Sequence, residues 1–154
     1  MGRNCGDLAL HAGLAGGADV ILVPEVQMEM NEICRRVIEG QASGKVHSLI
    51  IKAEGVQLKA DELAGMLEDI TGREARSVVL GYIQRGGNPT EKDRRIASLT
   101  AAKAVDLLFD DADSRAIGFS NGKLFSMPLE EALNIKSEFN SDMYELANVL
   151  GKGR

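Results

Sequence analysis

The chain changes character at one stretch, SVVLGYIQRGGNPT at residues 77–90. Its β-branched apolar start at 77–80 predicts a strand, and the glycine-rich turn that follows leads to a helix start at Thr90. Exposed amides at a helix N-terminus favour an anion, and Arg85 can add a bidentate grip on phosphate. An ordinary tight loop with solvated arginines is the alternative. The spacing alone leaves both interpretations open.

Upstream of this stretch, helices and strands alternate. The expected elements are a helix capped by Asn4 and ended by Gly16-Gly17, a strand at 20–23, a helix at 28–39 closed by Gly40, a strand at 46–51, a helix at 61–70 closed by Gly72, and the strand at 77–80. This order predicts an α/β fold, a parallel sheet with flanking helices. A βα unit normally begins with its strand, so the opening helix has two explanations: a frayed or truncated start, or a chain that begins in the middle of a larger fold.

Downstream of residue 90 the pattern differs. We expect a long helix from Thr90 to about Leu108, with an apolar stripe along one side. The dipeptide Asn121-Gly122 lies between two alternating runs, at 116–119 and 124–127, and both of its positions suit the positive φ of a tight hairpin turn. Two shorter helices are expected around 129–133 and 142–150.

Composition excludes several classes of partner. The net charge is −5, so nucleic acid and anionic lipid surfaces are poor partners. No apolar run is long enough to span a bilayer. Cys5 and Cys34 are too few for a disulfide scaffold, which indicates free thiols in a reducing cytoplasm.

Two blocks of sequence carry a family resemblance. The first is Gly81-Tyr82-Ile83-Gln84-Arg85-Gly86-Gly87, with Pro89, Asp93 and Arg94 following it, and the second is MGRNCGDLAL at residues 1–10. They resemble the G-[HY]-I-Q-R-G-G-x-P-x-x-x-D-R and M-G-R-x-C-G-D-L-x-L segments of 6-phosphofructokinases. The resemblance runs from the first residue to about Leu108 and continues more weakly beyond. It implies a Rossmann-like second domain of a bacterial-type, ATP-dependent enzyme, here as its C-terminal half.

The resemblance implies a site for fructose 6-phosphate. The MGR turn and the acid after the second strand would hold the sugar, which gives Met1, Gly2, Arg3 and Glu54. A solvated loop carboxylate is the alternative for Glu54.

The 6-phosphate would be held by Arg76, Tyr82 and Arg85, with Gln84 carried over from the same block. Tyr82 stands where many relatives have histidine; a phenol can donate a hydrogen bond but adds no charge. In the bacterial enzymes the residue matching Arg76 reaches a neighbouring subunit's site, so a homo-oligomer, usually a tetramer, is implied.

The resemblance also implies an allosteric site for ADP or phosphoenolpyruvate. Glu25 matches an acid near the effector's magnesium, with Val23 beside it, and Lys45 and His47 match basic residues that meet effector phosphates. Ser43 stands where some relatives carry a basic residue. A solvated lysine and a packed, neutral imidazole are the alternatives for Lys45 and His47.

The residues that move the phosphoryl group are not among these blocks. In the family, an aspartate of a T-I-D-N-D-like block acts as base, and a G-G-D-G block cradles ATP and its Mg²⁺; the 154 residues contain neither. We therefore expect a glycolytic kinase half that is inactive alone and binds no cofactor tightly. A pyrophosphate-dependent relative, a non-catalytic sugar-phosphate or nucleotide binding module, and a remnant without function are the alternatives.

The resemblance also predicts how the chain divides. Residues 1–84 would form the sugar-phosphate and effector part of the second α/β domain, and 136–154 a C-terminal helix. Residues 85–135, the long helix and the hairpin, would return to the first domain and pack on it.

Overall fold

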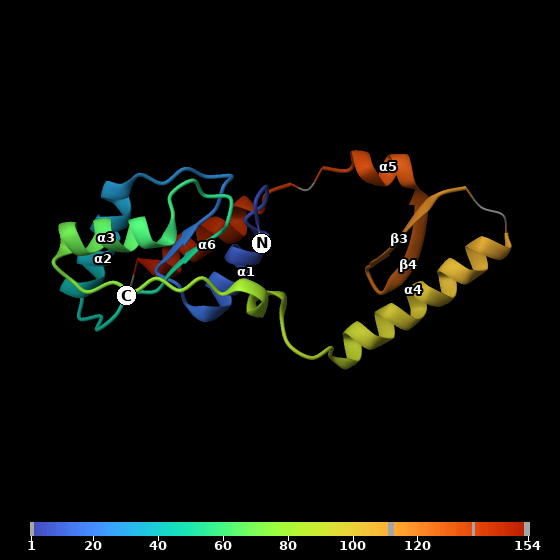
Figure 1. The fold of residues 1–154 in the computed structure, drawn as a ribbon, viewed down its shortest axis with the longest axis horizontal. Coiled ribbons are helices and arrows are strands. Elements are labelled where there is room, and N and C mark those ends of the chain that lie inside the picture. The colour runs from blue at the N-terminus through green and yellow to red at the C-terminus, as the bar shows by residue number, and fades with distance from the viewer. Residues whose placement is uncertain (1, 111–112, 137, 153–154) are drawn as a thin grey trace. The chain divides into compact units, whose positions relative to one another are not determined.

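The computed structural model describes residues 2–110, 113–136 and 138–152. The chain forms two compact units, Met1–Gln84 with Glu138–Arg154 (unit 1) and Arg85–Ser137 (unit 2). Figure 1 labels the helices of both units and the two strands of unit 2. No helix in the described ranges is long and apolar enough to cross a membrane.

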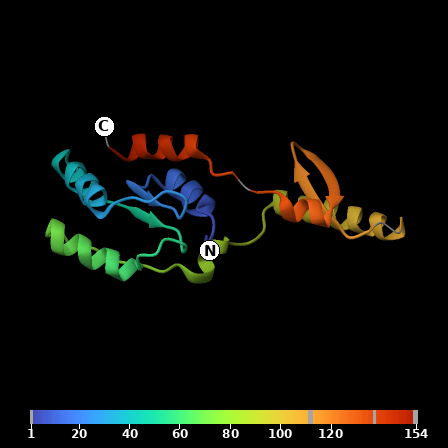
Figure 2. The same ribbon diagram turned by 90° about the horizontal axis from the view of Figure 1, so that it is seen from above.

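Unit 1 is built on a short parallel sheet. Its elements are α1 (Asp7–Gly16), β1 (Val20–Leu22), α2 (Met30–Ala42), β2 (Ile50–Lys52), α3 (Ala60–Thr71) and α6 (Ser141–Gly151). The two strands pair in parallel, with Val20 opposite Ile50. Figure 2 shows α6 and α3 on opposite sides of these strands. The predicted α/β fold with a helix-flanked parallel sheet is confirmed.

Two apolar clusters fill the two faces of this sheet. Successive side chains of a strand point to opposite faces. Ile21 therefore packs with Leu10 of α1 and Ala147 of α6, whereas its neighbours pack on the other cluster. That second cluster consists of Val20, Leu22, Ile33, Cys34, Val37, Leu63 and Leu67. Burial is nearly complete at the centre, where Leu10 is 0% and Val20 is 1% exposed.

Helix ends follow the glycines in two cases out of three. Gly17, at φ 69°, ends α1, and Gly72, at φ 67°, ends α3, as predicted. Gly40 does not end α2, which continues to Ala42; Gly40 is buried there, and a Cβ would lie 3.3 Å from Lys45 Cδ. This glycine lies within the helix and does not stop it.

The predicted cap of the first helix is also wrong. Asn4 lies outside α1, whose first residue is Asp7 and whose N-cap is Gly6. The Glu25 carboxylate accepts a hydrogen bond from the Gly6 amide at 2.7 Å. A side chain distant in sequence thus satisfies an amide at the start of this helix. No local sequence pattern indicates this contact.

The third predicted strand does not form. Residues 73–80 have no regular structure, and Val78 and Val79 are 75% and 81% exposed. The second strand is shorter than expected, since Val46 is 92% exposed and β2 starts at Ile50. A strand needs a neighbour for its backbone groups, and among the described residues of unit 1 β1 and β2 pair only with each other. The β propensity of residues 77–80 is therefore not enough to form a strand there.

Side chains of α3 hold this irregular segment instead. The Ala75 amide donates to Glu68 Oε1 at 2.7 Å, and the Ser77 hydroxyl donates to Asp61. A 3₁₀ turn, Gly81–Arg85, follows.

Unit 2 contains α4 (Glu91–Phe109), the antiparallel hairpin of β3 (Arg115–Ser120) and β4 (Lys123–Pro128), and α5 (Leu129–Asn134). The predicted long helix starts at a capping box: the Thr90 amide donates to Asp93 Oδ2 at 2.8 Å, and the Asp93 amide to Thr90 Oγ1 at 3.4 Å. The hairpin turn is confirmed at Asn121 and Gly122, with φ 51° and 78°.

Unit 2 lacks a core of its own among its described residues. None of them is buried. Leu108 and Phe109 at the end of α4 are 76% and 86% exposed, and Leu133 of α5 is 76% exposed. Its elements are present, but their apolar surface has no cover within the described part of the unit.

Candidate functional site

The first predicted group of sugar-site residues comes together in unit 1. Arg3 Nε donates to Glu54 Oε1 at 2.8 Å, across 51 residues of sequence. The Gly55 amide donates to the Gly2 carbonyl at 2.8 Å, so the two turns are also joined through their backbones. Met1 lies outside the described residues.

Glycines make this close approach possible. Gly2 has φ 91°, and a Cβ there would lie 2.8 Å from the Cys5 carbonyl oxygen. A Cβ on Gly55 would overlap the Arg3 carbonyl. The sequence therefore brings the backbones of the MGR turn and of the loop after β2 into contact that any side chain would prevent.

The charges of the pair stabilise each other. The hydrogen bond and charge of Arg3 lower the pKa of the Glu54 carboxyl, and those of Glu54 raise the pKa of Arg3. The Arg3 side chain is 82% exposed and that of Glu54 46%. A surface pair of this kind contributes little to stability, so a ligand can replace it at small cost. The guanidinium suits a phosphoryl oxygen, and the carboxylate suits sugar hydroxyls.

The phosphate-holding residues lie farther along the chain. Arg76 is 81% exposed and pairs with its near neighbour Glu74, Nη2 to Oε1, at 2.7 Å. Tyr82, 80% exposed, lies in the 3₁₀ turn Gly81–Arg85, which also holds Gln84 and Arg85. Arg85 is the first residue of unit 2, whereas Arg76, Tyr82 and Gln84 belong to unit 1.

Gln84 carries an unsatisfied acceptor. Its side-chain Oε1 is buried and has no hydrogen-bond donor among the described residues. A buried polar atom without a partner is unfavourable, so this oxygen is open to a hydrogen-bond donor, whether from water, a ligand or another segment.

The predicted effector residues have separate local roles. Val23 is 2% exposed and lies against Gly6, and Glu25 binds the Gly6 amide. Ser43 follows the end of α2 and donates to the Glu39 carbonyl at 2.9 Å. His47 is exposed, so the alternative of a packed imidazole is wrong.

Lys45 lies at a cavity that the sequence did not predict. Its ammonium pairs with the Asp19 carboxylate and donates to the Gly151 carbonyl at 3.1 Å. The cavity is lined by Leu14, Gly17, Ala18, Asp19, Lys45, Ala147 and Leu150. Asp19 was missed, although a signal existed: it directly precedes β1, and Lys45 precedes β2. Parallel strands start at the same edge of a sheet, so residues before them meet there.

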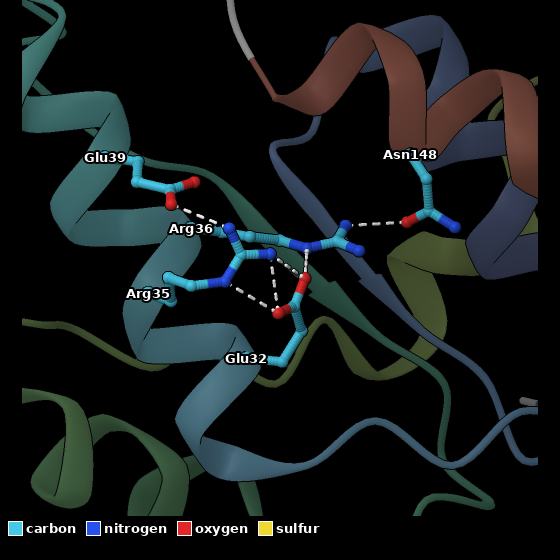
Figure 3. A network of polar contacts seen from close by, with 5 residues as sticks. All are labelled: Glu32, Arg35, Arg36, Glu39 and Asn148. Carbon is cyan, nitrogen blue, oxygen red and sulfur yellow. Dashed lines mark hydrogen bonds and ion pairs between the residues drawn. The ribbon is translucent and has the colours of Figure 1, made fainter.

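A second polar network fastens α6 to α2 (Figure 3). Arg36, whose side chain is 8% exposed, donates from Nε to Glu32 Oε1 at 2.8 Å and from Nη1 to Asn148 Oδ1 at 2.7 Å. Arg36 first, and then Arg35, lower the pKa of Glu32. Arg35 also pairs with Glu39 at 2.7 Å. No sequence motif marks Arg36, because its partner Asn148 is 112 residues away.

A metal site is not formed by the described residues alone. None of them makes a group of three or more His, Cys, Asp or Glu that could hold an ion. Glu25 as a ligand of an effector's magnesium stays a prediction, since it would bind the ion together with the effector.

The parallel sheet, with helices on both faces and exposed arginines on its loops, places the chain among α/β proteins. Comparison with known proteins is more specific. The phosphofructokinase family profile matches residues 1–108. The chain belongs to the phosphofructokinase family, which confirms the resemblance carried by the two sequence blocks.

Curated relatives agree. The chain is 51% identical over 150 residues to the ATP-dependent 6-phosphofructokinase of Alkaliphilus metalliredigens (strain QYMF), covering 97% of this chain and 47% of the relative. It is 47% identical over 152 residues to the enzyme of that name from Clostridium botulinum (strain Hall), covering 99% and 47%. The chain thus spans about half the length of the curated relatives it matches.

Solved structures give the same family. The Pichia pastoris phosphofructokinase in the T-state aligns with a TM-score of 0.77 and 30% identity, over 97% of this chain and 18% of that one. Phosphofructokinase from Saccharomyces cerevisiae aligns with a TM-score of 0.77 and 29% identity, over 97% and 20%.

Proposed function

We propose that this chain is the sugar-phosphate-binding half of an ATP-dependent 6-phosphofructokinase, a glycolytic enzyme of the cytoplasm that transfers phosphoryl from ATP to fructose 6-phosphate. The observation that carries the proposal is the Arg3–Glu54 pair, which joins two turns 51 residues apart at 2.8 Å. It supplies a cation for phosphoryl oxygen and an acceptor for sugar hydroxyls at one place. The 51% identity to an ATP-dependent enzyme supports the choice of donor.

In this proposal the chain binds and orients the sugar. Glu54 accepts hydrogen bonds from sugar hydroxyls, and Arg3 neutralises charge near the transferred group. Arg76, Tyr82 and Arg85 hold the 6-phosphate, and Gln84 Oε1 offers an acceptor that has no donor within the described residues. The high exposure of Arg76 fits a role in a neighbouring subunit's site, and therefore a homo-oligomeric enzyme.

ATP brings Mg²⁺ to such a reaction, where the ion neutralises charge on the phosphates. The described residues offer no group of three ligands for it. We propose that turnover needs residues that these 154 do not include.

Calorimetric titration with fructose 6-phosphate tests the proposal. The chain should bind the sugar phosphate, and Arg3→Ala should weaken binding by at least about tenfold, because a charge-assisted hydrogen bond contributes roughly 1.5–3 kcal/mol. Arg95→Ala is the matched control, since Arg95 pairs only locally with Glu91 on α4 at 2.8 Å. Binding that is unchanged in Arg3→Ala would contradict the assigned role.

A coupled assay separates enzyme from binding module. No turnover is expected from the chain alone with ATP or with pyrophosphate as donor. Turnover with pyrophosphate would favour the pyrophosphate-dependent relative, and absence of any sugar-phosphate binding would favour a remnant without function.

We also propose that ADP or phosphoenolpyruvate binds as an effector near Lys45, with His47, Ser43, Val23 and Glu25 as the remaining predicted contacts. The specific observation is that Lys45 lines a cavity and His47 is exposed beside it in sequence. Titration with ADP should show binding that Lys45→Met abolishes.

For unit 2 we propose that residues 85–135 pack on the remainder of the full-length protein. The supporting observation is the lack of any buried residue in the described part of unit 2. The isolated chain should therefore bind an apolar dye and self-associate in light scattering. A clean monomer without dye binding would contradict this.

A further inference from the structure

The ammonium group of Lys45 joins the last turn of α6 to the body of unit 1. Lys45 Nζ donates to the carbonyl oxygen of Gly151 at 3.1 Å and pairs with the Asp19 carboxylate. Three segments meet at this nitrogen: the residues before β2, the residue before β1 and the end of α6. Among these, Gly151 lies 106 residues from Lys45.

The contact is partly shielded from water. The Lys45 side chain is 29% exposed and that of Asp19 12%. Asp19 is held in place because its Oδ2 accepts from the Leu49 amide at 2.8 Å. The C-terminal end of a helix carries partial negative charge, so a cation there is favourable. Removing the ammonium would leave a shielded carboxylate and a helix end without their counter-charge.

Packing makes the end of α6 sensitive to this site. Gly151 is buried, and a Cβ on it would overlap the Asp19 carbonyl. The helix end thus lies directly against the backbone of the residue that pairs with Lys45. The second fastening, from Arg36 to Asn148, holds the preceding part of the helix.

We propose that Lys45 is a ligand-sensitive latch for α6: a phosphate-bearing ligand that takes the ammonium releases the last turn of the helix. This rests on the effector site proposed above. An ammonium has three N–H donors, and two of them are used by Asp19 and Gly151. A phosphate that accepts more than the remaining donor must displace one of these partners, and the uncharged Gly151 carbonyl is the weaker competitor.

Amide hydrogen exchange on the whole chain tests the latch. In Lys45→Met, the amides of the last turn of α6 should exchange about tenfold faster, because a charge-assisted contact that fixes that turn is lost. Lys45→Arg, which keeps the charge, should recover much of the protection. Lys59→Met is the matched control, as its side chain is 81% exposed and lies at α3; it should leave α6 unchanged.

Two outcomes of hydrogen exchange in these variants would contradict the proposal. Unchanged exchange in Lys45→Met would overturn the latch. If amides throughout unit 1 exchange faster in Lys45→Met, that variant has destabilised the whole unit. The same measurement is then made on Asp19→Asn, which weakens the ion pair and keeps the shape of the side chain. Faster exchange confined to α6 in that variant supports the latch, and exchange that stays unchanged there overturns it.

Inorganic phosphate tests release by ligand, at an ionic strength matched with chloride. Phosphate should speed exchange at the end of α6 in the unmodified chain and have no effect in Lys45→Met. Binding seen by calorimetry without a change at α6 would overturn the coupling but leave the effector site standing. Absence of binding would overturn the effector site and ligand release together, while the variants above still decide whether Lys45 fastens the helix.

Discussion

Unit 1 and unit 2 reach ordered secondary structure in different ways. Unit 1 buries apolar side chains on both faces of its sheet, with Leu10 at 0% and Val20 at 1% exposure. Unit 2 has a helix and a hairpin with well-formed ends, yet none of its described residues is buried. Local signals, a capping box at Thr90 and an Asn121-Gly122 turn, specify its elements. The difference shows that helices and strands can form without a buried core. The described part of unit 2 has the helices and the hairpin but no core.

The largest expected effect is a core truncation in unit 1. Leu10→Ala should lower the free energy of unfolding by about 2–5 kcal/mol, because it removes a fully buried side chain and leaves a cavity. Leu108→Ala in unit 2 should change it by less than about 0.5 kcal/mol, since that side chain is 76% exposed. Urea unfolding followed by circular dichroism measures both. Equal losses would break the comparison, because they would mean that unit 2 buries Leu108.

What could be predicted from the sequence follows the same division. Capping at Thr90, the hairpin turn and the glycine stops at Gly17 and Gly72 are local, and all are confirmed. The strand at 77–80 is wrong because strand formation depends on a neighbour, which propensity does not supply. The sequence predicts Asn4 as the cap of α1, whereas the structure has Gly6 at that position. The Gly6 amide donates to the carboxylate of Glu25, which is distant in sequence.

The candidate site shows the same limit. The Arg3–Glu54 pair followed from motif resemblance, and the structure brings the two side chains together. The Lys45–Asp19 contact depends on which strands are neighbours, and no sequence motif specifies it. The Arg36–Asn148 bond, between α2 and α6, depends on how distant helices pack. The spacing of residues in a motif identifies side chains that lie on one turn. Contacts between distant segments can be predicted only when the order and packing of the strands and helices are known.

Glycine substitutions sharpen the comparison within unit 1. Gly55→Ala should destabilise the chain by about 1–3 kcal/mol, because its Cβ would overlap the Arg3 carbonyl and force the two turns apart. It should also weaken binding of fructose 6-phosphate. Gly65→Ala is the control: it lies within α3 with nothing within 4 Å of the added Cβ, so it should stabilise by up to about 1 kcal/mol. A harmless Gly55→Ala would show that the turns are not in contact.

The cap of α4 tests whether unit 2 depends on local contacts. Thr90→Ala should destabilise that helix by about 1 kcal/mol, because the Asp93 amide loses its acceptor. Thr100→Ala is the matched control on the same helix, since its hydroxyl donates back within the helix, to the carbonyls of Ile96 at 2.9 Å and Ala97 at 3.0 Å. Amide exchange of α4 measures both. If Thr90→Ala leaves the first turn of α4 protected, contacts other than the cap hold unit 2.

The smallest expected effect is the pH response of the same cap. Hydrogen bonds from Thr90 lower the pKa of Asp93 below its ordinary value of 3.8. A carboxyl whose pKa is lower in the folded chain contributes stability above the unfolded value, and this contribution is lost as the pH falls toward the folded value. The start of α4 should therefore lose order only below that ordinary pKa. The Thr90 amide shift, followed by NMR from about pH 6 to pH 2, should show this step, and Asp93→Asn should remove it. A step that persists in Asp93→Asn would assign the titration to another acid and leave Thr90 alone as the group that holds the first turn.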